Sequence, residues 1–373
     1  MGNKNYIYSV GGLCSGIGGI ELGFKQSGFT ISWANDMDKY AMYTYKELIG
    51  ENHYIDNKPL KIEDILLNDD LLTKISYVDV LASGFPCQSF SLAGNKKGFG
   101  DSRGTVFFKI CELITFLQEK FSPPKVIFLE NVKNFRSHDN GNTFKTVKNH
   151  LENLGYSVYT KILNTSEMTG IPQNRERTFL VCFYGEHMWK NFQFDQKESD
   201  ADLFSELNEK EAKKKCPKTY LFHNNMREYK KIKKKSIDSF LIDHDKVDKK
   251  YFINERYERL FQTCIDQIDD NKTFYQYRRG KMRKNKNNNC PTLMANMGAG
   301  GHNVPIVLID KKKKLYRKLM PLECFYFQGF SNISLPSGVS DTQLYKQAGN
   351  SVTVPIITKL ASFIKFSLSV NNF

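Results

Sequence analysis

Short apolar runs alternate with amphipathic stretches through the first half of the chain. Apolar runs bounded by turn residues predict strands over 6–13, 30–34, 78–82, 125–129, 156–163 and 178–184, and a short strand or strand end at 62–65. Apolar residues with a period near 3.6 predict helices after 19, from 38, over 104–119 and over 144–154. This alternation up to about residue 185 predicts an α/β fold with a doubly wound, mostly parallel sheet.

The pattern changes after about residue 190. From there to about 320 the chain is rich in lysine and asparagine, and the alternation of strands and helices is lost. Order returns with a predicted helix over 317–327 and an apolar helix over 355–366, with Pro355 near its first turn. The sequence therefore predicts three parts: a catalytic and cofactor-binding domain over 1–190, a smaller irregular domain over 191–339, and a C-terminal segment, 340–373, that returns to the first domain.

The charge balance is strongly basic. The 373 residues carry a formal net charge of +14, and the sequence pI is near 9.2. Such a balance favours a polyanionic partner, usually nucleic acid, although a merely basic soluble surface is the alternative. In the second domain, arginines alternate with aromatic residues over 275–284, which suits phosphate contacts and base stacking. A solvated charge run is the other interpretation of that stretch.

Cysteine usage indicates reduced thiols. The 8 cysteines are scattered and form no Cys-x-x-Cys pair, so neither a disulfide framework nor a zinc site is predicted. No apolar run reaches transmembrane length, and the polar start is not a secretory signal. We therefore expect a cytoplasmic protein without a membrane partner.

A glycine-rich turn follows the first predicted strand. Residues 11–20 hold five glycines, which allow a tight turn and the close approach of a ligand to the backbone. Alone, this is weak evidence for a nucleotide-like cofactor. Asp36 lies twenty residues beyond Gly16, a spacing at which an acid meets ribose hydroxyls. A helix cap is an equally good interpretation of Asp36.

Two reactive side chains follow two later strands. Pro86 ends the apolar run at 78–82, so Cys87 is presented on a loop of small polar residues just past a strand end. Glu130 follows the strand at 125–129 in the same way. Open α/β sheets place their chemistry at such strand ends. An idle cysteine would be the commoner explanation of Cys87 taken alone.

Five motifs occur in an order that is informative as a set. They are Gly16-x-Gly18-Gly19, Pro86-Cys87-Gln88, Glu130-Asn131-Val132, Gln173-x-Arg175-x-Arg177 and Gly349-Asn350-Ser351-Val352. The set resembles the DNA cytosine-5 methyltransferase family of the bacterial restriction–modification type, in particular its HhaI type. The resemblance covers residues 6–184 and 315–360.

The resemblance implies S-adenosyl-L-methionine as methyl donor, with S-adenosyl-L-homocysteine as product and no metal. Asp36 would hold the ribose, Asp64 would bind the adenine amino group, and Cys14 stands where the family commonly has Phe. The residues implied for the cofactor are Cys14, Ser15, Gly16, Ile17, Gly18, Gly19, Asp36, Met37, Asp64, Ile65, Pro86, Asn350 and Ser351.

The resemblance also implies covalent catalysis. Cys87 would attack carbon 6 of cytosine as a thiolate, and Glu130 would protonate or hydrogen-bond nitrogen 3. Glu130 should therefore have a raised pKa. Arg177 would hold the exocyclic oxygen, and Arg175 would help to place Arg177 and the thiolate. The alternative for these three charged residues is a structural ion-pair cluster. The base that deprotonates carbon 5 is left unassigned.

Double-stranded DNA is the implied partner, with the target cytosine flipped out of the helix. The expected DNA contacts are Gln88, Ser89, Ser91, Arg103, Arg278, Arg279, Arg283, Thr292 and Leu293. A monomeric bacterial enzyme with a cognate restriction endonuclease is expected. The alternatives are a transfer-RNA cytosine-5 methyltransferase and an inactive DNA-binding relative. A nicotinamide oxidoreductase would explain the glycine-rich turn but not the other motifs.

Overall fold

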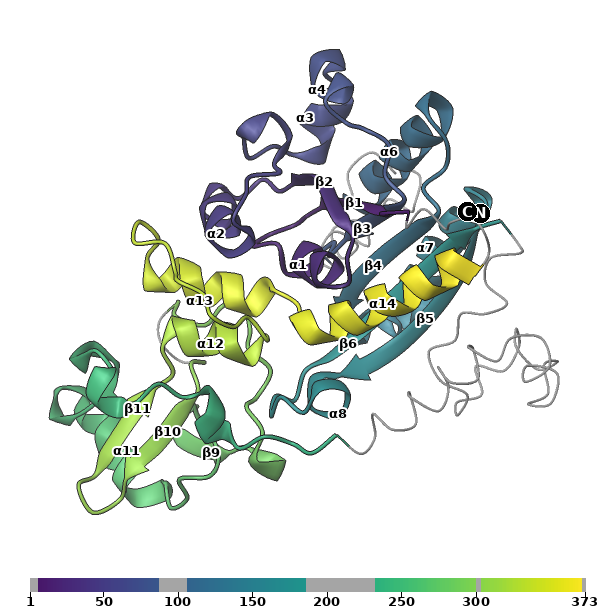
Figure 1. The fold of residues 1–373 in the computed structure, drawn as a ribbon. Coiled ribbons are helices and arrows are strands. Elements are labelled where there is room, and N and C mark those ends of the chain that lie inside the picture. Colours follow the sequence, from purple (N-terminus) through teal and green to yellow (C-terminus); the bar gives the residue numbers. More distant parts are fainter. Residues whose placement is uncertain (1–5, 87–105, 186–231, 300–302, 371–373) are drawn as a thin grey trace.

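The computed structural model describes residues 6–86, 106–185, 232–299 and 303–370. Its larger body is built on a six-stranded sheet in the order β2-β1-β3-β4-β6-β5 (Figure 1). The strands are β1 (Ser9–Leu13), β2 (Thr30–Asn35), β3 (Val80–Ser83), β4 (Val126–Val132), β5 (Tyr156–Asn164) and β6 (Glu176–Tyr184). The first four strands of this order are parallel, while β6 runs antiparallel to both β4 and β5. The predicted doubly wound, mostly parallel sheet is confirmed.

Helices cover both faces of this sheet (Figure 1). They are α1 (Gly19–Gln26), α2 (Lys39–Ile49), α3 (Ile62–Leu66), α4 (Asp69–Thr73), α6 (Val106–Lys120), α7 (Asn142–Asn153), α8 (Thr165–Thr169) and α14 (Val354–Val370). The chain order reverses at β1, which has β2 on one side and β3 on the other. Ligands of open α/β sheets bind at the carboxyl ends of the strands next to such a switch point.

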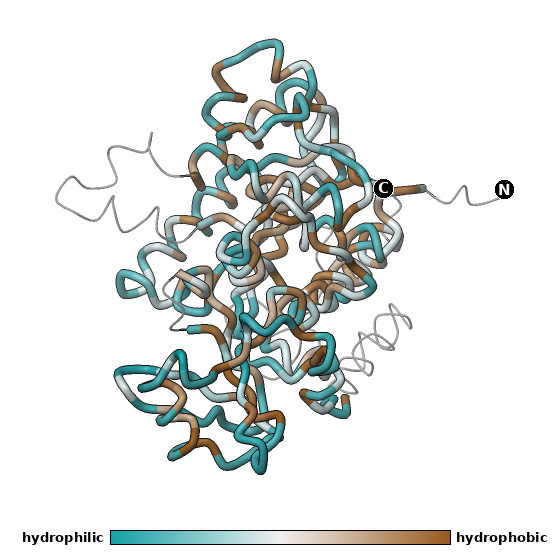
Figure 2. The backbone as a smooth tube through the Cα atoms, turned by 90° about the vertical axis from the view of Figure 1, so that its left-hand side faces the viewer, coloured by the Kyte–Doolittle hydropathy of each residue, from teal (hydrophilic) through white to brown (hydrophobic). Residues whose placement is uncertain are grey.

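One face of the sheet is covered by α1 and by the last helix of the chain, α14. Strand residues alternate between the two faces, so Val80 and Phe128 point to this side. Phe24 of α1 meets Phe128 edge to face, with ring centroids 5.4 Å apart. Leu360 of α14 is fully buried in the same cluster. Figure 2 shows the hydrophobic segments gathered in the interior and hydrophilic residues along the outer loops.

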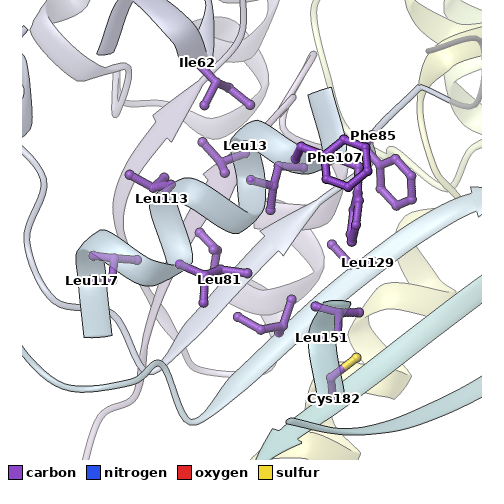
Figure 3. Packing of buried hydrophobic residues seen from close by; sticks show 14 of the residues in the cluster. Leu13, Ile62, Leu81, Phe85, Phe107, Leu113, Leu117, Leu129, Leu151 and Cys182 are labelled. Carbon is purple, nitrogen blue, oxygen red and sulfur yellow. The ribbon is translucent and has the colours of Figure 1, made fainter. Parts of the chain in front are cut away.

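The opposite face packs against α3, α6 and α7. The intervening strand residues, such as Leu81 and Leu129, point to this side and belong to the same cluster as Leu113 and Leu117 of α6 (Figure 3). Phe85, just past the end of β3, packs against rings in the same cluster, with its centroid 5.7 Å from that of Phe107. The segment that leads to Cys87 is therefore anchored in the core.

Two local predictions were wrong. Residues 62–65, expected as a strand or a strand end, belong to the helix α3, because a run of four residues is too short to reveal its period. Strand β4 continues to Val132, so Glu130 lies within the strand and not beyond it. Pairing with the antiparallel β6 extends β4, since Glu130 is opposite Phe179 and Val132 is opposite Arg177.

The smaller body contains a second sheet, in the order β7-β11-β10-β8-β9, with antiparallel pairing throughout. Its elements are β7 (Phe252–Ile253), β8 (Tyr275–Arg278), β9 (Lys281–Lys284), β10 (Ile306–Asp310), β11 (Leu315–Lys318) and the helix α11 (Glu258–Gln267). The expectation of an irregular domain is therefore wrong for its described part. Arg317, expected in a helix, lies in β11, and the helix α12 (Pro321–Phe327) begins only after it.

Strands β8 and β9 form a tight hairpin. Arg279 and Gly280 connect them, and both have positive φ, which matches the twist of a two-residue hairpin turn. Tyr275 is 1% exposed and Tyr277 packs beside it on the core cluster of this domain. The expectation that these aromatic rings stack on bases is thus wrong, because period-2 alternation turns them inward.

The C-terminal part of the chain, residues 341–370, contacts both the smaller body and the main sheet. The helix α13 (Asp341–Asn350) packs beside α12, and α14 returns to the main sheet (Figure 1). By length and composition alone, residues 341–369 match a membrane span. However, 67% of that apolar window is buried inside the protein, as in a core helix.

We expect Leu360→Ala to destabilise the protein by about 2–5 kcal/mol, because the substitution leaves a cavity between α1, α14 and the sheet. Urea unfolding followed by circular dichroism measures this. Ser362→Ala, on the exposed side of the same helix, is the control. Equal midpoints for the two variants would show that α14 does not contribute to the main core.

Candidate active site

A cavity of about 870 Å³ opens at the carboxyl ends of β1, β3 and β4. Segments that are far apart in the sequence surround it: 14–17, 35–38, 60–63, 84–86, 130–132, 292–295 and 349–352. Its size suits a ligand of nucleoside dimensions. All five motifs identified in the sequence contribute at least one residue to its walls.

The glycine-rich turn forms one wall. Cys14, Ser15, Gly16, Ile17 and Gly19 line the cavity. Gly16 has φ +52°, and a side chain built there would meet nothing within 4 Å, so the turn leaves open space above its backbone. Gly18, also expected to contact a cofactor, is not among the cavity residues. It has φ +81° and caps α1 instead.

Asp36 faces the cavity from the end of β2. Its Oδ2 accepts a hydrogen bond from the Gly16 amide at 2.8 Å, which ties it to the glycine-rich turn. The helix cap of α2 is a different residue, Asp38, whose Oδ1 accepts from the amides of Tyr40 and Ala41. Of the two interpretations of Asp36, the structure supports the one at the cavity. Met37 beside it lines the cavity with a side chain that is 69% exposed.

The prediction that Asp64 and Ile65 contact the cofactor is not supported by the cavity lining. Asp64 and Ile65 do not line the cavity. Asp64 is exposed and accepts a hydrogen bond from the Lys61 amide at the start of α3, while Ile65 is fully buried in the core. Ile62 and Glu63 face the cavity in their place. Helical geometry in α3 turns each successive side chain by about 100°, so the neighbouring residues point in different directions.

Glu130 is the buried acid of the cavity, with 8% of the residue exposed. Burial raises the pKa of its carboxyl, and the positive charges of Arg177 and Arg175 oppose this rise. Arg177 Nε lies 3.2 Å from Glu130 Oε1, but the geometry is not that of a hydrogen bond, and Oε1 has no hydrogen-bond donor. The carboxyl is therefore held beside a cation while one oxygen remains available to a ligand.

Glu130 also lies next to the segment that leads to Cys87. A methyl group at Gly84 would lie 3.7 Å from Glu130 Oε2. The neighbouring Asn131 donates from Nδ2 to the carbonyl of Phe85 at 3.0 Å, which fixes this backbone. Pro86 lines the cavity, and Cys87 follows it directly. Cys87 itself lies outside the described residues, as do Gln88, Ser89, Ser91 and Arg103.

Arg175 is fully buried and binds backbone from three places. Its guanidinium donates to the carbonyls of Leu293 at 2.9 Å and Gly349 at 3.0 Å, and also to that of Ser351. It therefore joins the second domain and the C-terminal motif to strand β6. These three acceptors are all backbone carbonyls.

Thr292 and Leu293, both expected to contact DNA, differ in how far their side chains are buried. Thr292 is half-buried at the cavity, and its hydroxyl donates to the Asn174 carbonyl at 2.5 Å. Leu293 has 0% exposure and packs in the core between the domains, which corrects the expectation that its side chain contacts DNA. The basic residues Arg279 and Arg283 are exposed on the β8–β9 hairpin, and Arg278 is half-buried there.

Gln347 is a cavity residue that sequence reasoning missed. Its Oε1 accepts from the Thr44 hydroxyl at 2.8 Å, while its Nε2 is buried without an acceptor. A free donor in a cavity wall suits a ligand oxygen. The sequence did hold a clue to Gln347. It lies three residues before Asn350, and helical spacing places these two side chains on one side of α13. Asn350 and Ser351 line the cavity as expected.

The thiols and acids of the described residues show no competing centre. All six described cysteines are free thiols, as expected for reduced cysteines. Burial raises the pKa of Cys14 to about 12, so it is a neutral thiol and not a second thiolate nucleophile. Among the described residues, Asp243, His244 and Asp245 lie close enough to share a cation, but all three are exposed.

The fold and the cavity together define a Rossmann-like α/β enzyme with a nucleotide-type cofactor site and a buried acid beside it. A family model described as C-5 cytosine-specific DNA methylase matches residues 8–365. The chain belongs to this family and is a DNA cytosine-5 methyltransferase.

Relatives support this assignment along the whole chain. The chain is 40% identical over 362 residues to the Type II methyltransferase M.Bsp6I of Bacillus sp. (strain RFL6), covering 96% of this chain and 99% of the relative. It is 32% identical to the Type II methyltransferase M.HhaI of Haemophilus parahaemolyticus, with 96% and 94% covered. The solved methyltransferase EhMeth of Entamoeba histolytica shares the fold, with a TM-score of 0.63, 18% identity and 99% and 100% covered.

We expect Arg175→Lys to lower the stability of the protein, because one ammonium group cannot reach three separated carbonyls. Each buried carbonyl left unpaired costs about 1–3 kcal/mol. Thermal unfolding measures the loss, and Arg256→Lys at an exposed position is the control. If both variants melt together, the three-carbonyl contact contributes nothing to stability.

Proposed function

We propose that the protein is a site-specific methyltransferase of a bacterial type II restriction–modification system, which methylates carbon 5 of a flipped-out cytosine in double-stranded DNA. The single observation that carries the mechanism is the convergence of Glu130, Arg177 and the segment 84–86 at one edge of the cofactor cavity. The relatives named above, which are called Type II methyltransferases, support the biological setting. Acting on bacterial DNA would place the protein in the cytoplasm.

The cavity residues fit S-adenosylmethionine. The open space above Gly16 admits a ligand against the backbone, and Asp36 presents a carboxylate to ribose hydroxyls. Met37 offers an apolar surface to the adenine, and the free Nε2 of Gln347 offers a donor to a carboxylate. When bound, this group supplies an electrophilic methyl on a sulfonium. We propose that these residues, with Asn350 and Ser351, hold it.

Covalent catalysis would proceed through Cys87 and Glu130. The Cys87 thiolate adds to carbon 6 of cytosine, and nitrogen 3 takes a proton from Glu130, so carbon 5 becomes nucleophilic. After carbon 5 has been methylated, its proton leaves to a base, the thiolate is eliminated from carbon 6 and the proton on nitrogen 3 returns to Glu130, which restores the neutral aromatic ring and the enzyme. Arg177, next to Glu130, would hold the exocyclic oxygen of the base.

The DNA would be bound by the basic second domain. In the β8–β9 hairpin, Arg278 pairs with Lys281 and Arg283 pairs with Gln276, so these side chains share the face opposite the tyrosines. A two-stranded ribbon of this kind fits the major groove of DNA. The excess positive charge of the chain adds affinity that falls with salt. We propose a monomer that acts on each strand separately, accompanied by a cognate endonuclease.

The test is methylation of a mixed-sequence plasmid by the pure protein and S-adenosylmethionine, followed by bisulfite sequencing. Protected cytosines within one short motif are the expected result. Transfer RNA is tested in parallel with labelled donor. Incorporation into RNA alone would replace DNA by RNA as the substrate, and binding of DNA without incorporation would identify an inactive relative.

We expect Cys87→Ala to abolish methyl transfer while DNA affinity is retained, because the substitution removes only the nucleophile. Filter binding and labelled-donor incorporation measure the two properties. Cys111→Ala, which replaces a half-buried thiol of α6 that does not line the cavity, is the matched control. Turnover by a clean Cys87→Ala preparation would exclude covalent catalysis by this residue.

We expect Glu130→Gln to reduce turnover about a hundredfold, the usual effect of removing an acid–base group. The protonated carboxyl is the donor, and burial raises its pKa, so wild-type turnover should fall as the pH rises through that pKa. The Gln variant should lack this fall. Rates between pH 5 and about 10 measure both effects. A near-normal rate for Glu130→Gln would rule out proton donation by Glu130.

A further inference from the structure

Gly12 and Glu21 occupy complementary space beside the cofactor turn. Gly12 lies in β1, and its φ is not positive, so its backbone does not require glycine. A Cβ at Gly12 would lie 1.8 Å from Glu21 Oε1 and 2.6 Å from Ser15 Oγ. Real atoms do not approach so closely. Gly12 therefore leaves the room that the Glu21 carboxyl fills.

The Glu21 carboxyl is connected to the cofactor turn through Ser15. Glu21 is 1% exposed, and its carboxyl is hydrogen-bonded by the Ser15 side chain. Ser15 is in turn tied to β2, because its amide donates to the Asn35 carbonyl at 2.9 Å. On the other side of the turn, the Gly16 amide donates to Asp36. Residues 14–16, which line the cavity, are thus held between two carboxyl groups.

One oxygen of the Glu21 carboxyl accepts no hydrogen bond. Its Oε2 is buried without a hydrogen-bond partner. Burial raises the pKa of Glu21 to about 7, the Ser15 hydrogen bond opposes this rise, and the charge of Asp36 adds to it. Cys14, Tyr45 and Tyr54 are the other titratable groups that interact with it. Among these described neighbours there is no lysine or arginine, so no cation neutralises the carboxylate.

We propose that Glu21 is a positioning residue of the methyl-donor site: its carboxylate, seated in the space left by Gly12, holds the turn 14–16 in the donor-binding conformation through Ser15. The inference rests on the proposed function, since it concerns the same donor site. Glu21 is not among the cavity residues and acts only through the turn. A charged acceptor strengthens the Ser15 hydrogen bond, so donor affinity rises as Glu21 ionises.

Three variants test the proposal. Glu21→Ala deletes the carboxyl, Glu21→Gln keeps its shape without the charge, and Gly12→Asp combined with Glu21→Ala returns a carboxyl to the same space from the strand side. The two single variants should raise the KM and the Kd for S-adenosylmethionine roughly 10- to 100-fold. The turnover at saturating donor should stay within about threefold, since no catalytic residue is altered. In the combined variant the new Cβ would still lie 2.6 Å from Ser15 Oγ, so the hydroxyl must rotate, and recovery of part of the affinity is expected.

Isothermal titration with S-adenosylmethionine and steady-state rates on plasmid DNA give these constants, with Glu47→Gln on the exposed side of α2 as control. Between pH 6 and about 8 the wild-type donor KM should fall as Glu21 ionises, and this fall should be smaller in Glu21→Gln. An unchanged donor KM in Glu21→Gln overturns the proposal. A wild-type protein that neither binds the donor nor methylates DNA overturns the proposed function instead.

Discussion

The assembly of the site depends on one buried guanidinium. Arg175 starts from the end of the main sheet and donates to the carbonyls of Leu293, Gly349 and Ser351. These groups lie more than a hundred residues away from it along the chain, in the second domain and before the last helix. A planar group with several fixed donors can satisfy such separated acceptors, and no other side chain offers the same fork. The cavity walls that these segments form are therefore held in register by a single residue.

The charges of the protein are divided between its inside and its outside. The chain as a whole is strongly basic, yet the cavity and its surroundings hold the buried carboxyl groups of Glu21 and Glu130 and the half-buried one of Asp36. Burial raises the pKa of each, so each can carry a proton closer to neutral pH than an exposed acid. An outer surface that attracts a polyanion and an inner site that handles protons and a cationic donor suit a DNA methyltransferase.

The topology brings the first and the last helix of the main sheet into one core. The first helix, α1, and the last, α14, share one face of the sheet, and Ser27 of the α1 end is hydrogen-bonded to the Thr358 carbonyl. The second domain is thus an insertion between two halves of one core. Since α14 continues from the motif at 349–352, the packing of this core also fixes one wall of the cavity.

The sequence by itself determined the six strands of the main sheet, the longer helices that cover it, the family, and most of the cofactor turn. Strong hydrophobic periodicity and ordered motifs are local properties of the chain. Tertiary structure decided what depends on the direction of a side chain. It placed Asp36 at the cavity and made Asp38 the cap of α2. It also placed Glu63, and not Asp64, in the cavity wall. Equally, the fit of the Glu21 carboxyl into the space above Gly12 exists only once α1 has packed against β1, since no one-dimensional pattern records which residues meet in space.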